Sequence, residues 1–328
     1  MTLPNGRSIA DYIEKWGNSS SIALLCPSCK IFCVPDIDGI IGYRLEAQCA
    51  VVLGDPVCSP EHMPNLVQAF HDHCQKDAKS VVYTIVSEQF ADWALKQGFC
   101  QWAAAIGDEI ILDPQCDPKA IKGKKGSSLR NKFLFSVRQG ISIHEYTGND
   151  VALEQELDTV RTSWLAQRKG PQACFFSEIH LFTDFAKKRY FYAKYKEAIV
   201  GIAMLNRLES TKGWVLNMLM KTPDAPTTTS EFLILSILDI VRQEGCPFFS
   251  IGTTPAPKLG RTEGLCGIYT WLVRMGFKIA SKILNLGGRQ RYWEKFQPKM
   301  APIFIMSSRS RLGLREALGI ARAFNAPI

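Results

Sequence analysis

The sequence predicts a mixed α/β or α+β fold that is divided into two lobes. Apolar runs of strand length alternate along the chain with amphipathic segments that start near hydroxyl or acidic residues and end at glycine. The 328 residues exceed the roughly 100–200 residues of a typical domain. Strands and helices also follow one another in a similar order in both halves, although the residues themselves do not repeat. We therefore expect two lobes, each with its own core.

The first lobe is predicted to occupy residues 1–116. It opens with a short amphipathic helix that Ser8 caps and Gly17 ends. The pattern then predicts strands at 31–34, 40–45, 49–53, 80–87 and 109–112, a turn at 36–39, and helices at 63–75 and 88–97. Strands and helices in this order are typical of one layered unit.

A basic segment at residues 117–140 is predicted to join the two lobes. Its cations accompany a single acid, Asp117, and make up a large share of the net charge of +8. They are Lys119, Lys122, Lys124, Lys125, Arg130, Lys132 and Arg138. Such a run is often only the solvated face of a helix. Gly123 and Gly126 nevertheless leave the backbone open to a ligand, and the first lysines precede a helix N-terminus, where amide donors are unpaired.

Apolar residues within the basic segment predict a helix that docks on the protein. Ser127 or Ser128 can cap this helix. Its apolar stripe follows the spacing i, i+4 and i+8, at Leu129, Phe133 and Val137. We therefore expect the stripe to face the protein and the cations to face outward.

The second lobe is predicted over residues 141–328. The pattern favours helices at 152–167 and 267–275, and one that has Glu231 in its first turn and stops at Gly245. It favours strands at 192–196, 198–207, 214–220, 247–251, 283–286 and 302–306. The tail at 308–324 interleaves arginines with apolar residues, as an interfacial helix does, although such helices more often pack on their own domain.

One stretch of the second lobe combines several features of a ligand site. Pro223-Asp224-Ala225-Pro226 forces an exposed turn after a strand, because two prolines fix the backbone and remove amide donors. Hydroxyls at 227–230 can then cap the helix that carries Glu231 in its first turn. The next strand ends in Gly252-Thr253-Thr254. Ligands bind at such strand ends in open α/β sheets, so Asp224 and these hydroxyls are candidates for one site.

Composition points to a cytoplasmic protein without a structural metal. The longest apolar runs fall well short of the ~20 residues that cross a bilayer, and no secretory signal is present. Eleven scattered cysteines fit reduced thiols. Cys26-Pro-Ser-Cys29 and Cys33 could form a zinc or redox site only with nearby ligands at 71–74, and the two histidines there point to different helix faces. We expect no metal site.

Four segments in the same order resemble the catalytic domain of the aminoacyl-phosphatidylglycerol synthases, also called phosphatidylglycerol lysyltransferases. They are Val52-Leu53-Gly54-Asp55-Pro56-Val57, the basic run 122–130, the turn at 223–226 and Tyr292-Trp293-Glu294-Lys295-Phe296. The resemblance runs from about residue 31 to 305, and the order of the four motifs is more specific than any one of them. The membrane-embedded flippase region that precedes the family's catalytic domain has no counterpart in this sequence.

The resemblance implies a tandem of two acetyltransferase-like (GNAT) lobes joined by the basic helix. It also implies transfer of an amino acid, most often lysine or alanine, from aminoacyl-tRNA to phosphatidylglycerol or a related lipid. No cofactor is expected, because the tRNA ester is already activated. The partners would be aminoacyl-tRNA and an anionic lipid at the inner face of the membrane.

Candidate site residues follow from the motifs and from this chemistry. Asp224 is the first candidate for a catalytic carboxylate, with Glu231 as the reserve. Gly252, Thr253 and Thr254 are candidates for contact with the acyl group or its oxyanion. Contact with the tRNA terminus or headgroup phosphate is assigned to Tyr292, Lys295 and Arg291. The sequence departs from the family pattern at Gln290, where arginine is common. Phosphates of tRNA would contact Lys122, Lys124, Lys125, Arg130 and Lys132.

Two other functions fit parts of the sequence. An acyl-CoA-dependent N-acyltransferase of the same fold needs a glycine-rich pyrophosphate loop, to which Arg261-Thr262-Glu263-Gly264-Leu265-Cys266 is a poor and acidic match. A non-catalytic RNA- or membrane-binding protein would keep the basic segment and not depend on Asp224. The amino acid and the oligomeric state are not specified by these patterns.

Overall fold

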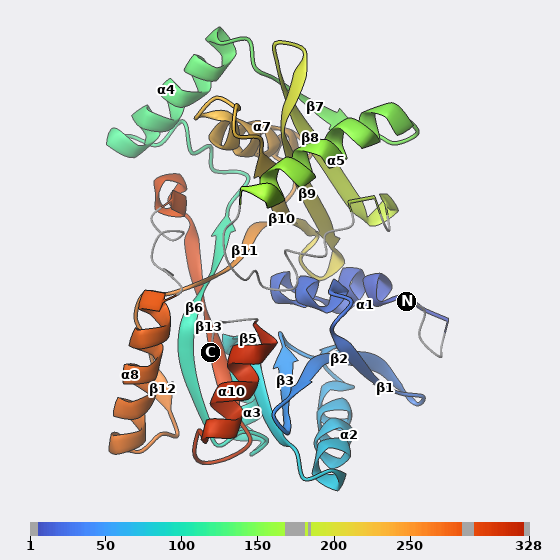
Figure 1. The fold of residues 1–328 in the computed structure, drawn as a ribbon, viewed down its shortest axis with the longest axis vertical. Coiled ribbons are helices and arrows are strands. Elements are labelled where there is room, and N and C mark those ends of the chain that lie inside the picture. The colour runs from blue at the N-terminus through green and yellow to red at the C-terminus, as the bar shows by residue number, and fades with distance from the viewer. Residues whose placement is uncertain (1–5, 168–180, 183–184, 284–291, 325–328) are drawn as a thin grey trace.

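The computed structural model describes residues 6–167, 181–182, 185–283 and 292–324, and its two lobes lie one above the other in Figure 1. The predicted fold class is confirmed, because strands and helices mix along the chain and the strands pair into a large mixed sheet. The strands are β1 (Lys30–Val34), β2 (Ile37–Glu46), β3 (Cys49–Leu53), β4 (Val57–Cys58), β5 (Ser80–Ser87), β6 (Trp102–Leu112), β7 (Ser142–Tyr146), β8 (Lys188–Tyr195), β9 (Ala198–Leu208), β10 (Gly213–Lys221), β11 (Phe249–Pro255), β12 (Thr262–Glu263) and β13 (Lys299–Ser307).

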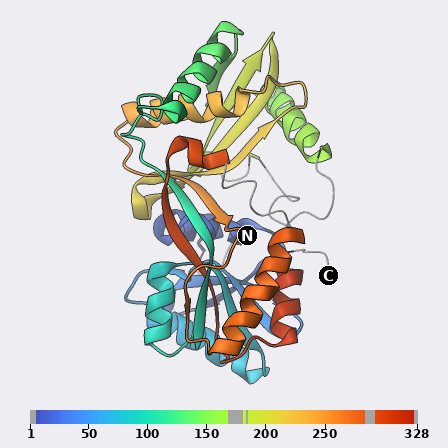
Figure 2. The same ribbon diagram turned by 90° about the vertical axis from the view of Figure 1, so that its left-hand side faces the viewer.

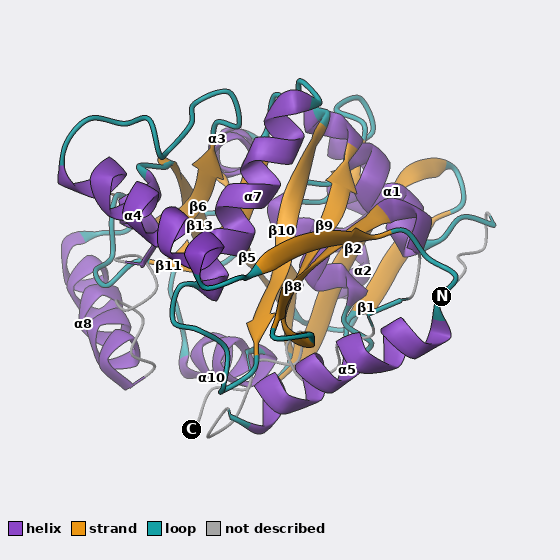
Figure 3. Ribbon diagram, turned by 90° about the horizontal axis from the view of Figure 1, so that it is seen from above, coloured by secondary structure: helices purple, strands orange, loops and turns teal. Residues whose placement is uncertain are grey.

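Helices cover both faces of the sheet (Figures 1 and 3). The α-helices are α1 (Ile9–Trp16), α2 (Met63–Lys76), α3 (Glu88–Lys96), α4 (Lys124–Arg138), α5 (Val151–Ala166), α7 (Thr229–Gln243), α8 (Gly267–Ile283) and α10 (Leu314–Ala323). Short 3₁₀ helices are η1 (Ser19–Leu25), η2 (Phe185–Lys187), η3 (Glu209–Thr211) and η4 (Glu294–Phe296).

The sheet runs without a break from the lower lobe to the upper one. Its order is β1-β2-β3-β5-β13-β6-β11-β10-β9-β8-β7, with β4 added on β2 and β12 on β6. β13 pairs antiparallel with both β5 and β6, so a strand from the end of the chain completes the sheet of the first half. The division at residues 116 and 140 stays a prediction, and the course of β13 shows that the two halves of the sequence share this sheet.

In the upper lobe, alternate residues of the strands face opposite layers. Phe191 and Ala203 belong to the cluster that packs against α7. Their neighbours Tyr190 and Ile202 belong to the cluster beneath α5. Side chains point alternately to the two faces of a strand, and here helices cover both faces. This explains why β8 and β9 are apolar at consecutive positions.

α1 lies between the two lobes (Figure 1). The predicted cap is confirmed: Ser8 and Asp11 form a capping box at the helix start. Lys187 of the upper lobe pairs with Asp11 and, at 3.1 Å, with Glu14. The helix therefore ties the lobes together through charged contacts.

The C-terminal tail packs on its own domain. A Cβ added to Gly319 of α10 would lie 3.0 Å from the carbonyl oxygen of Glu46, so the helix approaches the sheet closely. Arg44 donates a hydrogen bond to the carbonyl oxygen of Ala323 at 3.0 Å. Of the two placements considered for the tail, docking on the parent domain is the one observed.

Several element boundaries differ from the predictions. β6 begins at Trp102 rather than at residue 109. The turn after β1 takes only residues 35–36, because β2 starts at Ile37. α8 continues to Ile283, so the predicted strand at 283–286 is wrong at its first residue, and the other three lie outside the described ranges. A short apolar run is compatible with a strand or with a helix, and here it extends the helix α8.

Candidate functional site

The start of α4 differs from the prediction. The helix begins at Lys124, and its N-cap is Gly123 with φ +95°, so neither Ser127 nor Ser128 caps it. Glycine adopts this backbone conformation readily, whereas other residues are strained in it. Gly126 is buried, and a Cβ there would lie 1.9 Å from the carbonyl oxygen of Ile121. Gly126 therefore serves close packing and does not open the backbone to a ligand.

Only part of the predicted stripe on α4 docks. Leu129 is fully buried, and Phe133 packs edge-on against Phe232 of α7 with ring centroids 5.0 Å apart. Val137 is 52% exposed, so its predicted docking is wrong. Ser136 lies on the inner face instead, because i+7 stays closer to the stripe than i+8 in a helix of 3.6 residues per turn.

Hydroxyls join α4 to the start of α7. Thr228 is the N-cap of α7, but its side chain makes no capping hydrogen bond. Its Oγ1 accepts a hydrogen bond of 2.7 Å from Ser136 Oγ. The predicted capping role of this hydroxyl is therefore wrong, and the contact holds the two helices together beside the first turn of α7.

Three charged residues from distant parts of the sequence meet at this place, and we call them the Glu231 cluster. Oε1 of Glu231, in the first turn of α7, accepts hydrogen bonds from Lys132 Nζ at 2.5 Å and Lys295 Nζ at 2.7 Å. Lys132 comes from α4 and Lys295 from η4. The Glu231 side chain is only 6% exposed. Two ammonium groups thus share one buried carboxylate.

Burial and charge act in opposite directions on the Glu231 cluster. Burial alone would raise the pKa of Glu231, but the hydrogen bonds from Lys132 and Lys295 outweigh it and hold that pKa below its usual value. Burial also lowers the pKa of Lys295, although Glu231 works against this effect. The cluster therefore keeps Glu231 ionised and makes Lys295 a readier proton donor than an ordinary lysine.

Tyr292 lies directly beside the Glu231 cluster. The ammonium nitrogen of Lys295 stands 3.5 Å from the centroid of the Tyr292 ring, a cation–π contact. Burial, together with the nearby charge of Glu231, raises the pKa of Tyr292 well above its usual value. Its buried hydroxyl makes no hydrogen bond of normal geometry with a described residue, although the side chain of Ser230 lies near enough to oppose the rise in its pKa. A protonated phenol without a well-formed hydrogen bond is a donor available to a ligand.

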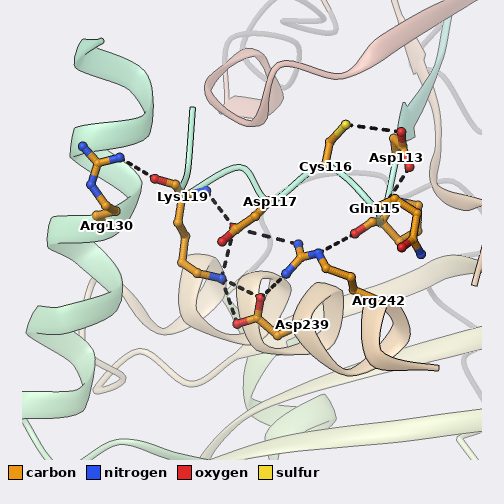
Figure 4. A network of polar contacts seen from close by, with 9 residues as sticks. Asp113, Gln115, Cys116, Asp117, Lys119, Arg130, Asp239 and Arg242 are labelled. Atoms are coloured by element: carbon orange, nitrogen blue, oxygen red, sulfur yellow. Dashed lines mark hydrogen bonds and ion pairs between the residues drawn. The ribbon is translucent and has the colours of Figure 1, made fainter. Parts of the chain in front are cut away.

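The segment that enters α4 is tied to α7 by the network in Figure 4. Lys119 Nζ donates to both carboxylate oxygens of Asp239, at 2.6 and 2.8 Å. Arg242 donates to Asp239 at 2.7 Å and to the carbonyl oxygen of Pro114 at 2.7 Å. Asp117 lies 3.2 Å from Lys119 Nζ. These contacts position α4, and they engage the ammonium group of Lys119 within the protein.

The five cations predicted to bind phosphate differ in what they contact. Lys122 and Lys124 are exposed and make no polar contact with described residues. Lys125 donates to the carbonyl oxygen of Glu294 at 3.2 Å, and Arg130 to the carbonyl oxygens of Lys119 and Ile121. Lys132 is held by Glu231. The most accessible charge therefore lies at the start of α4.

A broad open groove of about 880 Å³ runs along α4. It is lined by Gly123, Lys124, Ser127, Ser128, Arg130, Asn131, Lys132, Phe135 and Thr228. Lys132 links the groove to the Glu231 cluster. Phe135 is 48% exposed and was not among the predicted site residues. In the sequence, Phe135 lies outside the apolar stripe of Leu129, Phe133 and Val137. That position is the one sequence signal that could have indicated its exposure.

Gly252, Thr253 and Thr254 lie within β11, which continues to Pro255, whereas the predicted strand ended at residue 251 and left them in a loop. Gly252 has φ +85° and interrupts the register between β11 and β6, after which Thr253 stands opposite Glu109 and Thr254 opposite Asp108. The hydroxyl of Thr254 is buried without a partner among the described residues. β11 pairs with β10 only at Trp214–Phe249 and Val215–Ser250, so the two strands separate before this point.

Asp224 lies in an exposed turn between β10 and α7. The amide of Ala225 donates to the carbonyl oxygen of Thr222 at 3.3 Å, which closes the predicted turn. The carboxylate of Asp224 makes no hydrogen bond or ion pair with a described residue. It is therefore accessible, unlike Glu231. Arg291, the remaining predicted site residue, lies outside the described residues.

Asp55 of the motif at 52–57 is a partly buried carboxylate that makes no ion pair with a cation of the described residues. It accepts hydrogen bonds from Ser87 N at 2.8 Å, Ser87 Oγ at 2.6 Å and Asn18 Nδ2 at 2.9 Å. Burial raises its pKa to about 6 despite these donors. Because the three donors belong to the start of α3 and to the cap of η1, Asp55 joins these elements to the end of β3.

The segment compared with a pyrophosphate loop is occupied by the protein itself. Arg261 pairs with Glu88 at 3.3 Å, Asp92 at 3.2 Å and Glu263 at 2.9 Å. Thr262 and Glu263 form β12 against β6. Three carboxylates around the only cation of this loop disfavour binding of a pyrophosphate.

No metal cluster or membrane span is found within the described ranges. Their His, Cys, Asp and Glu side chains nowhere form a group of three or more suited to a metal ion. The side chains of Cys26 and Cys29 are buried, and His71, which is partly buried rather than solvated, contacts the hydroxyl of Tyr83 at 3.0 Å. No helix in these ranges combines the length and apolarity needed to cross a bilayer.

Fold and site together define a two-lobed α/β domain with a basic groove beside a buried lysine–glutamate cluster. The chain belongs to the family described as "Phosphatidylglycerol lysyltransferase, C-terminal", whose model matches residues 11–307. It is 23% identical over 310 residues to a phosphatidylglycerol lysyltransferase of Bacillus subtilis (strain 168), covering 91% of this chain and 34% of that protein. A protein of the same name from Staphylococcus epidermidis is 22% identical over 308 residues, covering 90% and 34%. The chain spans about a third of these relatives.

Solved structures share the fold. The structure of L-PGS from Bacillus licheniformis superimposes with a TM-score of 0.76 at 20% identity, covering 99% of this chain and 98% of that chain. A C-terminal domain structure from Agrobacterium fabrum gives a TM-score of 0.74 at 18% identity, covering 96% of each chain. Membership of the family that the four motifs resembled is thereby confirmed.

Proposed function

We propose that this chain transfers an amino acid, lysine or alanine, from aminoacyl-tRNA to phosphatidylglycerol or a related anionic lipid at the bilayer surface. The names of the curated relatives support lysine and phosphatidylglycerol. The observation that carries the proposal is the Glu231 cluster, in which Lys132, Glu231 and Lys295 from three separate segments meet beside a basic groove.

The reaction requires positioning and a path for one proton. The acceptor hydroxyl oxygen bonds to the acyl carbon of the aminoacyl ester, and the ester bond to the tRNA breaks. The acceptor's proton passes to the departing tRNA oxygen, so atoms and charge balance. The ester is already activated, and correct placement of the two substrates supplies much of the rate.

The site residues divide this work. Oε1 of Glu231 is shared by two lysines, so Glu231 acts as a positioning residue. Lys295 and the hydroxyl of Tyr292 bind the anionic headgroup or the developing oxyanion. Asp224, the accessible carboxylate, binds the α-ammonium of the donor amino acid or assists proton transfer. The segment 252–254 completes the substrate contacts.

The groove on α4 binds the acceptor end of the tRNA. Lys122 and Lys124 are available for phosphates, and the exposed ring of Phe135 can stack on an unpaired base. Replacing Lys124 with alanine should weaken tRNA binding and lower its salt dependence by about one phosphate contact. Replacing Phe135 with alanine should weaken binding without changing the salt dependence.

The test is transfer of radiolabelled amino acid from charged tRNA to lipid by the purified chain. The assay compares the unmodified chain with Asp224→Asn and, as a matched exposed control, Asp36→Asn in the β1–β2 turn. We expect ribonuclease-sensitive label in lipid, about a hundredfold less with Asp224→Asn, and tRNA binding nearly unchanged. Absence of lipid label with every charged tRNA would overturn the proposal, and acetyl-CoA consumption with amines would favour the acyltransferase. Equal transfer by Asp224→Asn would remove Asp224 from the mechanism.

A further inference from the structure

α8 exposes an unusual amount of apolar surface. Its exposed large apolar side chains have exposed fractions between 41% and 68%. They are Ile268, Trp271, Leu272, Met275 and Ile279. No described residue of α8 belongs to any of the four hydrophobic clusters of the protein. The helix lies on the outside of the molecule, at the left in Figure 1 and facing the viewer in Figure 2.

The exposed side chains of α8 form one continuous stripe. Their spacing of i, i+3, i+4, i+7 and i+11 places them on a single helix face. The opposite face holds the helix to the protein: Val273 and Phe277 are partly buried, Ser281 donates to the carbonyl oxygen of Pro257 at 3.0 Å, and the Tyr269 ring contacts Arg311. The outer stripe is therefore not needed for docking.

The charges of α8 indicate what covers the stripe. The exposed cations Arg274 and Lys278 lie along one side of it, and the helix sequence contains no aspartate or glutamate. A flat basic helix with tryptophan and aliphatic residues on its outer face suits the headgroup region of an anionic bilayer. If a second copy of the chain covered the stripe with its own α8, the cations of the two helices would lie close together. Neither helix has an acidic residue to neutralise them, so this contact is disfavoured.

We propose that α8 is the surface by which this chain lies on an anionic bilayer, with the stripe inserted among the lipid headgroups. The proposal deepens the proposed function, on which it rests for the lipid acceptor, by naming the surface that meets the membrane. It requires neither tRNA nor turnover. The two ideas can therefore fail separately.

The experiment is co-sedimentation of the 328-residue chain with vesicles of equal parts phosphatidylglycerol and phosphatidylcholine, and with pure phosphatidylcholine vesicles. The double variant Trp271→Ser, Leu272→Ser should bind the anionic vesicles about a hundredfold more weakly, because each lost side chain contributes about tenfold. Val151→Ser, which removes an exposed apolar residue of α5, is the matched control and should bind normally.

Charge is tested separately. Arg274→Gln with Lys278→Gln should weaken binding to anionic vesicles about twentyfold and leave the weak binding to neutral vesicles unchanged. Lys76→Gln on α2, another exposed lysine, is the control. Unfolding midpoints should match for all variants, because every replaced side chain is exposed.

Two results would overturn the assignment of α8. One is equal vesicle binding by the Trp271 variant and the Val151 control. The other is a dimer in analytical ultracentrifugation that Trp271→Ser converts to a monomer, which would make the stripe a self-association surface. Transfer to detergent-dispersed lipid without vesicle binding would overturn the role of α8 and leave the proposed function intact. Vesicle binding without transfer would support the role of α8 and overturn the proposed function.

Discussion

Asp55 in the lower lobe and Glu231 in the upper lobe are carboxylates withdrawn wholly or partly from solvent, but their partners differ. Asp55 accepts hydrogen bonds only from neutral groups of Ser87 and Asn18, and burial raises its pKa to about 6. Burial also opposes ionisation of Glu231, yet two ammonium groups hold its pKa below the usual value. Burial raises the pKa of both groups, and only the charged partners of Glu231 reverse the direction. Asp55 joins structural elements, whereas Glu231 keeps two cations in place.

The largest expected effect on stability is that of Asp55→Ala. The substitution leaves the backbone amide and hydroxyl of Ser87 and the side-chain amide of Asn18 without their acceptor in a partly buried place. We expect the free energy of unfolding to fall by about 3 kcal/mol. Urea denaturation followed by circular dichroism measures it, with Asp36→Ala as the exposed control. A change no larger than that of the control would show that water replaces the carboxylate.

The pH dependence of stability should separate the two carboxylates. The pKa of Asp55 rises from 3.8 to about 6 on folding. Its contribution to the free energy of unfolding is therefore fully present below pH 3.8 and is lost as the pH rises through 6. The whole loss amounts to about 3 kcal/mol. The pKa of Glu231 is lowered from 4.5, so its contribution is present above pH 4.5 and is lost as the pH falls through its folded value.

Urea midpoints measured between pH 4 and pH 8 test whether Asp55 and Glu231 have opposite effects on the pH dependence of stability. Asp55→Asn should remove the loss of stability that the unmodified chain shows between pH 4 and pH 7. Glu231→Gln should destabilise the chain near pH 7 and have less effect near pH 4. Parallel pH profiles for the two variants would contradict the assignment of opposite pKa shifts.

Glu231→Gln should have a smaller effect at neutral pH. Lys132 and Lys295 keep a solvent-exposed part, so they can turn toward water once their shared carboxylate is neutral. We expect a loss of about 1 kcal/mol in the free energy of unfolding. Adding Lys132→Met should recover part of it, because one unpaired cation is removed. No recovery in the double variant would mean that repulsion between the lysines is not the cause.

Asp224→Asn should have the smallest effect on stability. The side chain is exposed and has no polar contact with a described residue, so the urea midpoint should not move measurably. The same variant is expected to lose transfer activity. A lower midpoint would show instead that Asp224 holds the turn between β10 and α7, and its loss of activity would then have a structural origin.

The sequence by itself determined part of the local structure, where the signal for a helix end is a single residue beside it. Ser8 caps α1 as predicted, and α7 ends before Gly245, which takes φ +70°. These signals lie within a few residues of the backbone that they shape, so no distant contact is needed to interpret them. The motifs also pointed to Glu231 and Lys295 as site residues, although not to their contact with each other.

Tertiary structure alone decided which of these residues meet and which helices dock. Lys132 and Glu231 are 99 positions apart, and Glu231 and Lys295 are 64 apart, so no spacing rule relates them. α8 and α10 are both basic and amphipathic, yet α10 packs on β2 and β3 while α8 exposes its apolar stripe. A periodic pattern specifies that a helix has an apolar face. What covers that face depends on the surfaces that the rest of the chain brings near it.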